Sequence, residues 1–158
     1  MFTVEKPTAE QLYPQLCADL RALCEGVPHR IANLANASAL LAQYLERINW
    51  VGFYLMQDGR LVLGPFQGTP ACIEIAVGRG VCGTAVARDA VVRVPDVHAF
   101  PGHIACDDAS RSEIVLPLHK DGEVIGVLDI DSPVPERFTE ADEDGLIRAV
   151  QVLEQFAL

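Results

Sequence analysis

The chain has 158 residues, with 22 acidic and 12 basic side chains and a formal net charge of −10. This length suits one domain over residues 1–158, and a hydrophobic content of 50% argues against disorder. The acidic balance disfavours nucleic acid and anionic membranes as partners, and no apolar run approaches the ~20 residues of a membrane span. With no pattern of a secretory signal, we expect a cytoplasmic protein that binds a small molecule or another protein.

Helices are expected near both ends of the chain. Apolar positions recur at helical spacing over 16–24, and Pro14 suits the first turn of this helix. A second helix is expected over 30–46. A last helix is expected to follow Thr139, which forms a capping-box pattern with Asp142.

Between these helices the apolar period changes to two, which is typical of strands. Asp58-Gly59 and Asp121-Gly122 each separate two such runs and indicate β-hairpins. Hairpins make a sheet antiparallel, and segregated helices favour an α+β fold. We expect helices on one face of the sheet and a ligand pocket on the other. The six expected strands cover 48–56, 60–66, 72–77, 91–97, 113–119 and 123–131.

The five cysteines do not indicate a disulfide framework, because their number is odd and the expected compartment is reducing. Cys17 and Cys24 share a helical face and are interpreted as small buried hydrophobes. Cys106 lies within 95–112, a long segment without periodicity, and such segments are usually functional when they are ordered. Cys106 is therefore singled out.

Two other patterns are weak. GRGVCG at 78–83 matches G-x-G-x-x-G, but a dinucleotide site needs a parallel βαβ unit, so a tight turn at a helix start is the better interpretation. Such a turn would place Cys82 near the positive end of a helix. The spacing H-x4-H-x2-C fits no standard zinc pattern, so we expect no metal at His98, His103, Cys106 and Asp107.

Strand alternation gathers two kinds of side chain. Trp50 and Tyr54 share a face on either side of Gly52, which indicates either a packed aromatic cluster or the wall of a pocket. Asp129 and Asp131 share a face with Ile125 and Val127 on the strand 123–131.

Glu113 opens the neighbouring hairpin strand, so three acids could converge at one end of the sheet. They either stay solvated at the strand ends or lie buried, where they would meet a cation or share a proton.

Taken together, these segments resemble the free methionine-(R)-sulfoxide reductases, which are stand-alone GAF-domain enzymes. The resemblance is dense over 49–138. It rests on NWVGFYL, LGPFQGTPACIEI, GRGVCGTA, HIACDDASRSEIVLPL and GVLDIDSP.

The resemblance implies a GAF fold, reduction of free methionine sulfoxide, recycling by thioredoxin, a cytoplasmic homodimer, and neither a metal nor an organic cofactor. It implies that Cys106 is the catalytic cysteine and that Cys72 resolves its sulfenic acid, with Cys82 as a second thiol in the same region. The residues it implies for substrate binding are Trp50, Tyr54, Glu113, Asp129 and Asp131.

Other functions compete with this one. A non-catalytic GAF module that senses a small ligand would share the fold and the pocket, but it has no evident need for three thiols. A redox sensor without a substrate pocket would keep Cys106 and Cys72 but would not need the aromatic and acidic residues. Acidic neighbours should keep the Cys106 thiol protonated, so we expect the ammonium group of the substrate to activate it.

Overall fold

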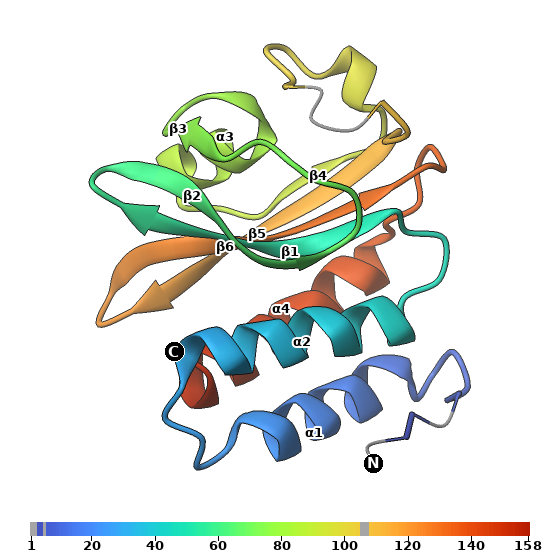
Figure 1. The fold of residues 1–158 in the computed structure, drawn as a ribbon. Helices are drawn as coiled ribbons and strands as arrows, with labels where there is room; N and C mark the ends of the chain where they lie inside the picture. The colour runs from blue at the N-terminus through green and yellow to red at the C-terminus, as the bar shows by residue number, and fades with distance from the viewer. Residues whose placement is uncertain (1–2, 5, 105–107) are drawn as a thin grey trace.

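The computed structural model describes residues 3–4, 6–104 and 108–158, so Cys106 and Asp107 lie outside the described residues. Within these ranges it contains four α-helices, a 3₁₀ helix and one six-stranded sheet (Figure 1). None of these helices is long and apolar enough to cross a membrane. In chain order the elements are α1 (Leu12–Cys24), α2 (Arg30–Tyr44), β1 (Trp50–Gln57), β2 (Arg60–Gln67), β3 (Glu74–Ala76), α3 (Gly80–Arg88), β4 (Val92–Val94), η1 (Val97–Ala99), β5 (Ser112–Lys120), β6 (Glu123–Ser132) and α4 (Glu140–Phe156).

The sheet has the strand order β3-β2-β1-β6-β5-β4, and every neighbouring pair is antiparallel. The α+β class and both expected hairpins are therefore confirmed. The edge strands are shorter than expected. β4 ends before Pro95, which has no N–H for the ladder. Val97 then begins η1, whose cap is the side chain of Asp96 accepting from the His98 amide.

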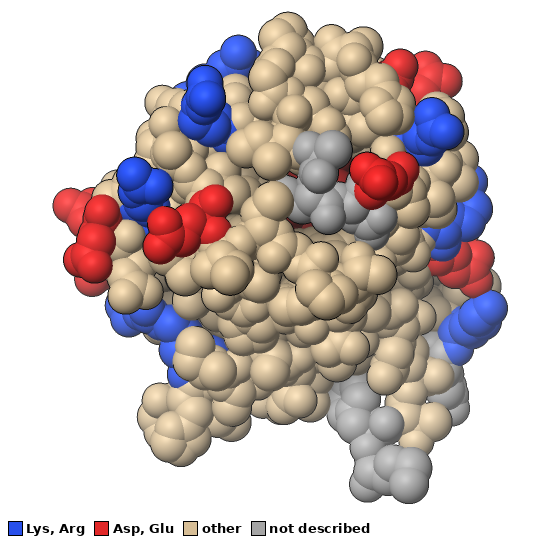
Figure 2. Space-filling model, turned by 45° about the horizontal axis from the view of Figure 1, so that its top comes forward, with Lys and Arg blue, Asp and Glu red and all other residues tan. Residues whose placement is uncertain are grey.

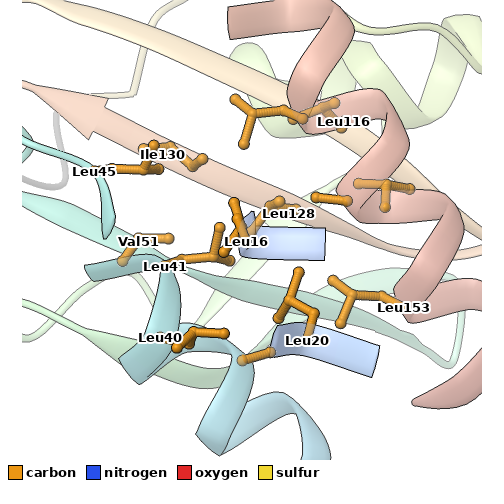
Figure 3. Close-up of a cluster of buried hydrophobic side chains, with 14 of the residues drawn as sticks. Leu16, Leu20, Leu40, Leu41, Leu45, Val51, Leu116, Leu128, Ile130 and Leu153 are labelled. Atoms are coloured by element: carbon orange, nitrogen blue, oxygen red, sulfur yellow. The ribbon is translucent and has the colours of Figure 1, made fainter. Parts of the chain in front are cut away.

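Helices α2 and α4 cover one face of the sheet, and α1 packs on the outer side of these two (Figure 1). The core between helices and sheet is formed by side chains such as Leu16, Leu41 and Leu128, all with no exposed surface (Figure 3). Gly145 allows α1 to approach α4, because a Cβ there would lie 2.1 Å from the ring of Tyr13. This layer therefore depends on close helix packing as well as on apolar burial.

The start of α4 is fixed as expected, by a capping box between Thr139 and Asp142. The Asp142 carboxylate also accepts a hydrogen bond of 2.6 Å from the Tyr13 hydroxyl and pairs with Arg137 at 3.1 Å. These contacts tie α1, α4 and the preceding turn into one buried polar network.

The opposite face carries a second apolar cluster, which includes Trp50, Tyr54 and Val127. The helices expected near the chain ends cover one face as predicted, and the short helix α3 packs against β5 and β6 on this second face. The expected face is wrong for Ile125, which packs with the helix-side cluster. The register between β5 and β6 shifts between Leu118 and His119. This irregularity reverses which face of the sheet the side chains of β6 occupy on the hairpin side of the shift.

Candidate functional site

Strand register brings the three predicted acids together on the face that carries α3. Glu113 of β5 pairs opposite Asp131 of β6, and Asp129 pairs opposite Gly52 of β1. Glu113 is 6% exposed and Asp129 is 5% exposed, whereas Asp131 is half-buried. The alternative of solvated strand ends is therefore wrong for Glu113 and Asp129. Their carboxyl groups lie inside the protein.

Burial changes the protonation of this cluster. It raises the pKa of Glu113 well above its usual range, and the negative charges of Asp129 and Asp131 raise this pKa further. Burial also raises the pKa of Asp129, although hydrogen bonds with Glu113 and Cys82 oppose this rise. Since two adjacent buried carboxylates repel each other, the pair favours a shared proton, and the larger rise in pKa falls on Glu113.

Cys82 contributes a thiol to the same place. It lies in the first turn of α3, is 4% exposed, and is a free cysteine. One ligand atom each from Cys82, Glu113 and Asp129 lies within 4.8 Å of the other two. Burial raises the pKa of the Cys82 thiol, and the charges of Asp129 and Glu113 add to the effect. Its position at a helix start was expected, but it is a buried, protonated thiol.

The GRGVCG segment positions that thiol through its backbone. Gly80 adopts φ of +60°, and a Cβ at Gly83 would lie 2.4 Å from the Ala76 carbonyl oxygen. The amide of Gly78 donates to the Gly83 carbonyl at 2.8 Å. β3 before it pairs antiparallel to β2. The motif is therefore a tight turn into α3, and it does not lie in a parallel βαβ unit.

Aromatic side chains form one wall of the site. Trp50 stacks on Phe66 with ring centroids 5.2 Å apart, and on Tyr54 at 6.0 Å. A Cβ at Gly52 would lie 2.3 Å from Cβ of Phe66, so the space above Gly52 is filled by Phe66. Both interpretations of the aromatics hold, because Trp50 and Tyr54 are packed and also line the cavity.

Two hydrogen bonds connect these aromatics to the segment between β2 and β3. The Trp50 indole N–H donates to the Thr69 carbonyl at 3.1 Å, and the Tyr54 hydroxyl donates to the Cys72 carbonyl at 2.9 Å. Cys72 is disulfide-bonded, whereas Cys82 and the distant Cys24 are free thiols. The wall and the cysteine segment are thus held together.

The cavity between these groups has a volume of about 40 Å³. It also brings in residues for which the sequence suggested no substrate role: Arg79 and Gly80 at the start of α3, and His103 and Ser110 from the segment before β5. Burial lowers the pKa of His103, and the neighbouring His98 lowers it further. In the view of Figure 2, Lys and Arg lie around the margins, whereas acidic side chains lie both at the margins and near the centre.

The start of α3 suits an anionic group. The N-cap residue Arg79 makes no side-chain hydrogen bond to the helix, and both Arg79 and Gly80 line the cavity. The first amides of a helix and its dipole favour negative charge. The cavity therefore has a carboxylate side at Glu113 and Asp129 and a cationic side at α3. A zwitterion would fit this arrangement.

Comparison with known proteins supports the same conclusion. The GAF domain model matches residues 19–158. The free methionine-R-sulfoxide reductase of Escherichia coli K12 is 59% identical over 145 residues, which is 92% of this chain and 88% of that protein. The chain belongs to the GAF-domain family of free methionine-R-sulfoxide reductases. The family's enzyme from Saccharomyces cerevisiae is 41% identical over 152 residues, covering 91% of this chain and 84% of that protein.

Solved structures agree with this membership. The free methionine-R-sulfoxide reductase of Neisseria meningitidis, in complex with its substrate, superposes with a TM-score of 0.93 at 42% identity. The match covers 98% of this chain and 95% of that one. The fold of this family member is therefore that of a GAF domain.

Proposed function

We propose that this protein reduces free L-methionine-(R)-sulfoxide to L-methionine, with Cys106 as the nucleophile. The observation that carries the proposal is the buried pair of Glu113 and Asp129, which faces a cavity walled by Trp50 and Tyr54. The relatives named as free methionine-R-sulfoxide reductases support the reaction class. Cys106 itself lies outside the described residues, so its role rests on the resemblance and on the chemistry of thiols.

The reaction that we propose uses two thiols in turn. The Cys106 thiolate attacks the sulfoxide sulfur, and the oxygen transfers with a proton to leave methionine and a Cys106 sulfenic acid. The Cys72 thiol then condenses with this sulfenic acid, which forms a disulfide and releases water. An external dithiol reduces the disulfide by exchange and is itself oxidised. Each cycle consumes two electrons.

Cys72 is a better candidate than Cys82 for the resolving step. Cys72 is disulfide-bonded in the structure, while Cys82 is a buried free thiol hydrogen-bonded to Asp129. Its raised pKa makes Cys82 a poor nucleophile at neutral pH. We assign Cys72 to resolution and Cys82 to the acid cluster.

Glu113 is our candidate for the proton donor to the sulfoxide oxygen. Burial and the neighbouring carboxylates raise its pKa well above the usual range, which favours the protonated form that a general acid requires. Asp129 and Asp131 then supply the negative charge that holds the substrate ammonium group. A peptide-bound methionine sulfoxide has no such ammonium group and would leave buried charge unpaired, so the cluster selects the free amino acid. The substrate carboxylate would lie at Arg79 and the first amides of α3.

We propose thioredoxin as the reductant of this enzyme. We also propose that the enzyme acts in the cytoplasm as a homodimer. Ile73, which directly follows Cys72, is 71% exposed and offers apolar contact for a protein reductant beside the disulfide. The dimer comes from the resemblance alone. Sedimentation velocity of the purified protein would test it, and a monomer at micromolar concentration would refute it.

The experiment that tests the function is a thioredoxin-coupled NADPH assay with four substrates: the R and S epimers of free methionine sulfoxide and both epimers within a peptide. Turnover of the free R epimer alone, lost in Cys106→Ser and kept in Cys17→Ser, is expected. Cys17 is a matched control because it is a half-buried thiol on α1. If the reduced wild-type protein turns over none of these substrates, the non-catalytic ligand-sensing module becomes the better assignment.

A further inference from the structure

We propose that Cys82, Glu113 and Asp129 form a binding site for a thiophilic divalent cation of the Zn²⁺ class, and that its occupation inhibits the enzyme. The cation would act as an inhibitor and not as a cofactor of the reaction. Three ligand atoms of types that Zn²⁺ accepts, one sulfur and two carboxylate oxygens, lie within 4.8 Å of one another. All three residues are buried and all three line the same cavity.

An unpartnered oxygen provides a second observation. Although Asp129 takes part in hydrogen bonds with Glu113 and Cys82, its Oδ1 atom is buried and has no hydrogen-bond partner among the described residues. Asp129 is only 5% exposed and lines the cavity that Cys82 and Glu113 also face. An unpaired carboxylate oxygen in such a place is costly, and a cation at the centre of the three ligands would remove that cost.

The distances fit after a small movement of side chains. Zn–S bonds of about 2.3 Å and Zn–O bonds of about 2.1 Å place tetrahedral ligands roughly 3.5 Å apart. Ligands already within 4.8 Å need to close by about 1 Å, which side-chain rotation allows. The fourth position would face the cavity and hold a water. Binding releases the thiol proton of Cys82 and the proton shared by the acids.

The ligand set also predicts selectivity. A thiolate favours Zn²⁺ and Cd²⁺, whereas Mg²⁺ and Ca²⁺ need six or more oxygen ligands, which two carboxylates do not supply. The inhibitory consequence rests on the proposed function, because the cation would occupy the position of the substrate ammonium and would remove the proton from Glu113. The binding site itself does not rest on it.

The test uses Cd²⁺, because a thiolate bound to Cd²⁺ absorbs in the ultraviolet. The protein is titrated in its disulfide form, in which Cys72 is not a free thiol. Wild type and Cys17→Ala are expected to show the charge-transfer band at one Cd²⁺ per chain, and Mg²⁺ is expected to produce none. Cys82→Ser and Cys82→Ala are expected to lose the band.

Asp129→Asn is expected to weaken Cd²⁺ binding by more than about tenfold. Loss of a residue that only hydrogen-bonds a metal ligand already lowers metal affinity by about tenfold or more, and Asp129 would be a ligand itself. Thermal unfolding of each variant without metal shows whether it is folded. An unchanged band in folded Cys82 variants, its loss in Cys17→Ala, or no band in wild type would overturn the site.

Inhibition is measured separately, as the concentration of Zn²⁺ that halves turnover at increasing methionine sulfoxide. That concentration is expected to rise in proportion to substrate. If the wild-type protein shows the Cd²⁺ band that depends on Cys82 but turns over no methionine sulfoxide, the proposed metal site stands and the proposed function is refuted. Turnover insensitive to Zn²⁺ at saturating occupancy would refute the inhibition.

Discussion

The hydroxyl of Tyr54 donates a hydrogen bond of 2.9 Å to the backbone carbonyl of Cys72. Tyr54 is 2% exposed and lies in the central strand β1, so a rigid part of the sheet holds the backbone of a cysteine in the long connection before β3. Through this bond, the aromatic wall of the cavity and the proposed resolving thiol form one unit.

Replacement of Tyr54 with Phe tests this unit. The ring would still pack against Trp50, but the Cys72 carbonyl would lose its partner. We expect steady-state turnover to fall by about tenfold, while the first, single-turnover formation of methionine is nearly unchanged, because only the resolving step uses Cys72. Quenched-flow measurement of the first turnover separates the two steps. Equal loss in both would show that Tyr54 serves substrate binding instead.

Glu113→Gln tests the proton donor. Glutamine keeps the size of the side chain but cannot deliver a proton, so we expect kcat to fall by about 10² to 10⁴-fold. Glu123→Gln, an exposed acid at the far end of the same hairpin, is the matched control and should retain wild-type activity.

The pH profile of the wild type provides a further check on Glu113. Because burial raises its pKa, we expect kcat to stay high below that raised value and to fall as pH rises through it. An undiminished kcat in Glu113→Gln would remove Glu113 from this role.

The reactivity of Cys106 should depend on ligand. The carboxylates around the cavity disfavour a thiolate, so we expect a thiol pKa at or above the usual value of about 8.5 in the free protein. Bound methionine should lower it, because its ammonium group offsets the negative field. Alkylation rates of Cys106 against pH, with and without methionine and read by peptide mass spectrometry, measure this. An apparent pKa below about 7 without ligand would contradict the idea.

Asp142 should be important for stability. Its removal leaves Arg137, which is 8% exposed, as a buried charge without its carboxylate and also breaks the bond from Tyr13. We expect Asp142→Ala to lower the free energy of unfolding by about 3–5 kcal/mol in urea titrations. Glu140→Ala, an exposed acid in the same first turn, should change it by no more than about 0.5 kcal/mol.

The same network predicts how stability depends on acid. Burial alone would raise the pKa of Asp142, but hydrogen bonds from Thr139 and Tyr13 and the charge of Arg137 lower it overall. The stability it contributes is present above the unfolded-state pKa of about 3.9 and is lost as pH falls through the lowered value. Asp142→Ala should therefore be less sensitive to acid than wild type.

His119 predicts the opposite dependence. Its ring lies between Asp89 after α3 and Glu154 of α4, and the hydrogen bond with Asp89 is the main cause of its raised pKa. The stability it contributes is present below the unfolded-state pKa of about 6.5 and is lost as pH rises through the raised value. The difference in Tm between wild type and His119→Gln should be larger near pH 5 than near pH 9. His29→Gln, an exposed histidine before α2, should show no such difference.

The central hairpins could be predicted because Asp58-Gly59 and Asp121-Gly122 each separate two apolar runs of strand length. Strand alternation placed Asp129 and Asp131 on one face, and register then brought Glu113 opposite Asp131. What alternation cannot give is burial. Whether Glu113 is solvated depends on α3 and on the segment before β5, which cover it from distant parts of the chain.

Other features were missed because no local signal marks them. Arg79 lies between two glycines in a motif interpreted as a turn, and only the position of α3 against the sheet directs it to the cavity. Ile125 was placed on the wrong face because the irregularity near Leu118 depends on pairing between strands. Phe66 could not be placed over Gly52 before the register of β1 and β2 was known.

The pairing of Glu113 with Asp131 and of Gly52 with Asp129 has a consequence for folding itself. If β6 slipped by one residue against its neighbours, Asp129 and Asp131 would turn toward the leucines beneath α2 and α4, where a carboxylate has no partner and costs several kcal/mol. The acids therefore penalise every odd misalignment of the central strands. A protein that replaced all three with apolar residues would gain burial but lose this guard against mispaired, aggregation-prone sheets.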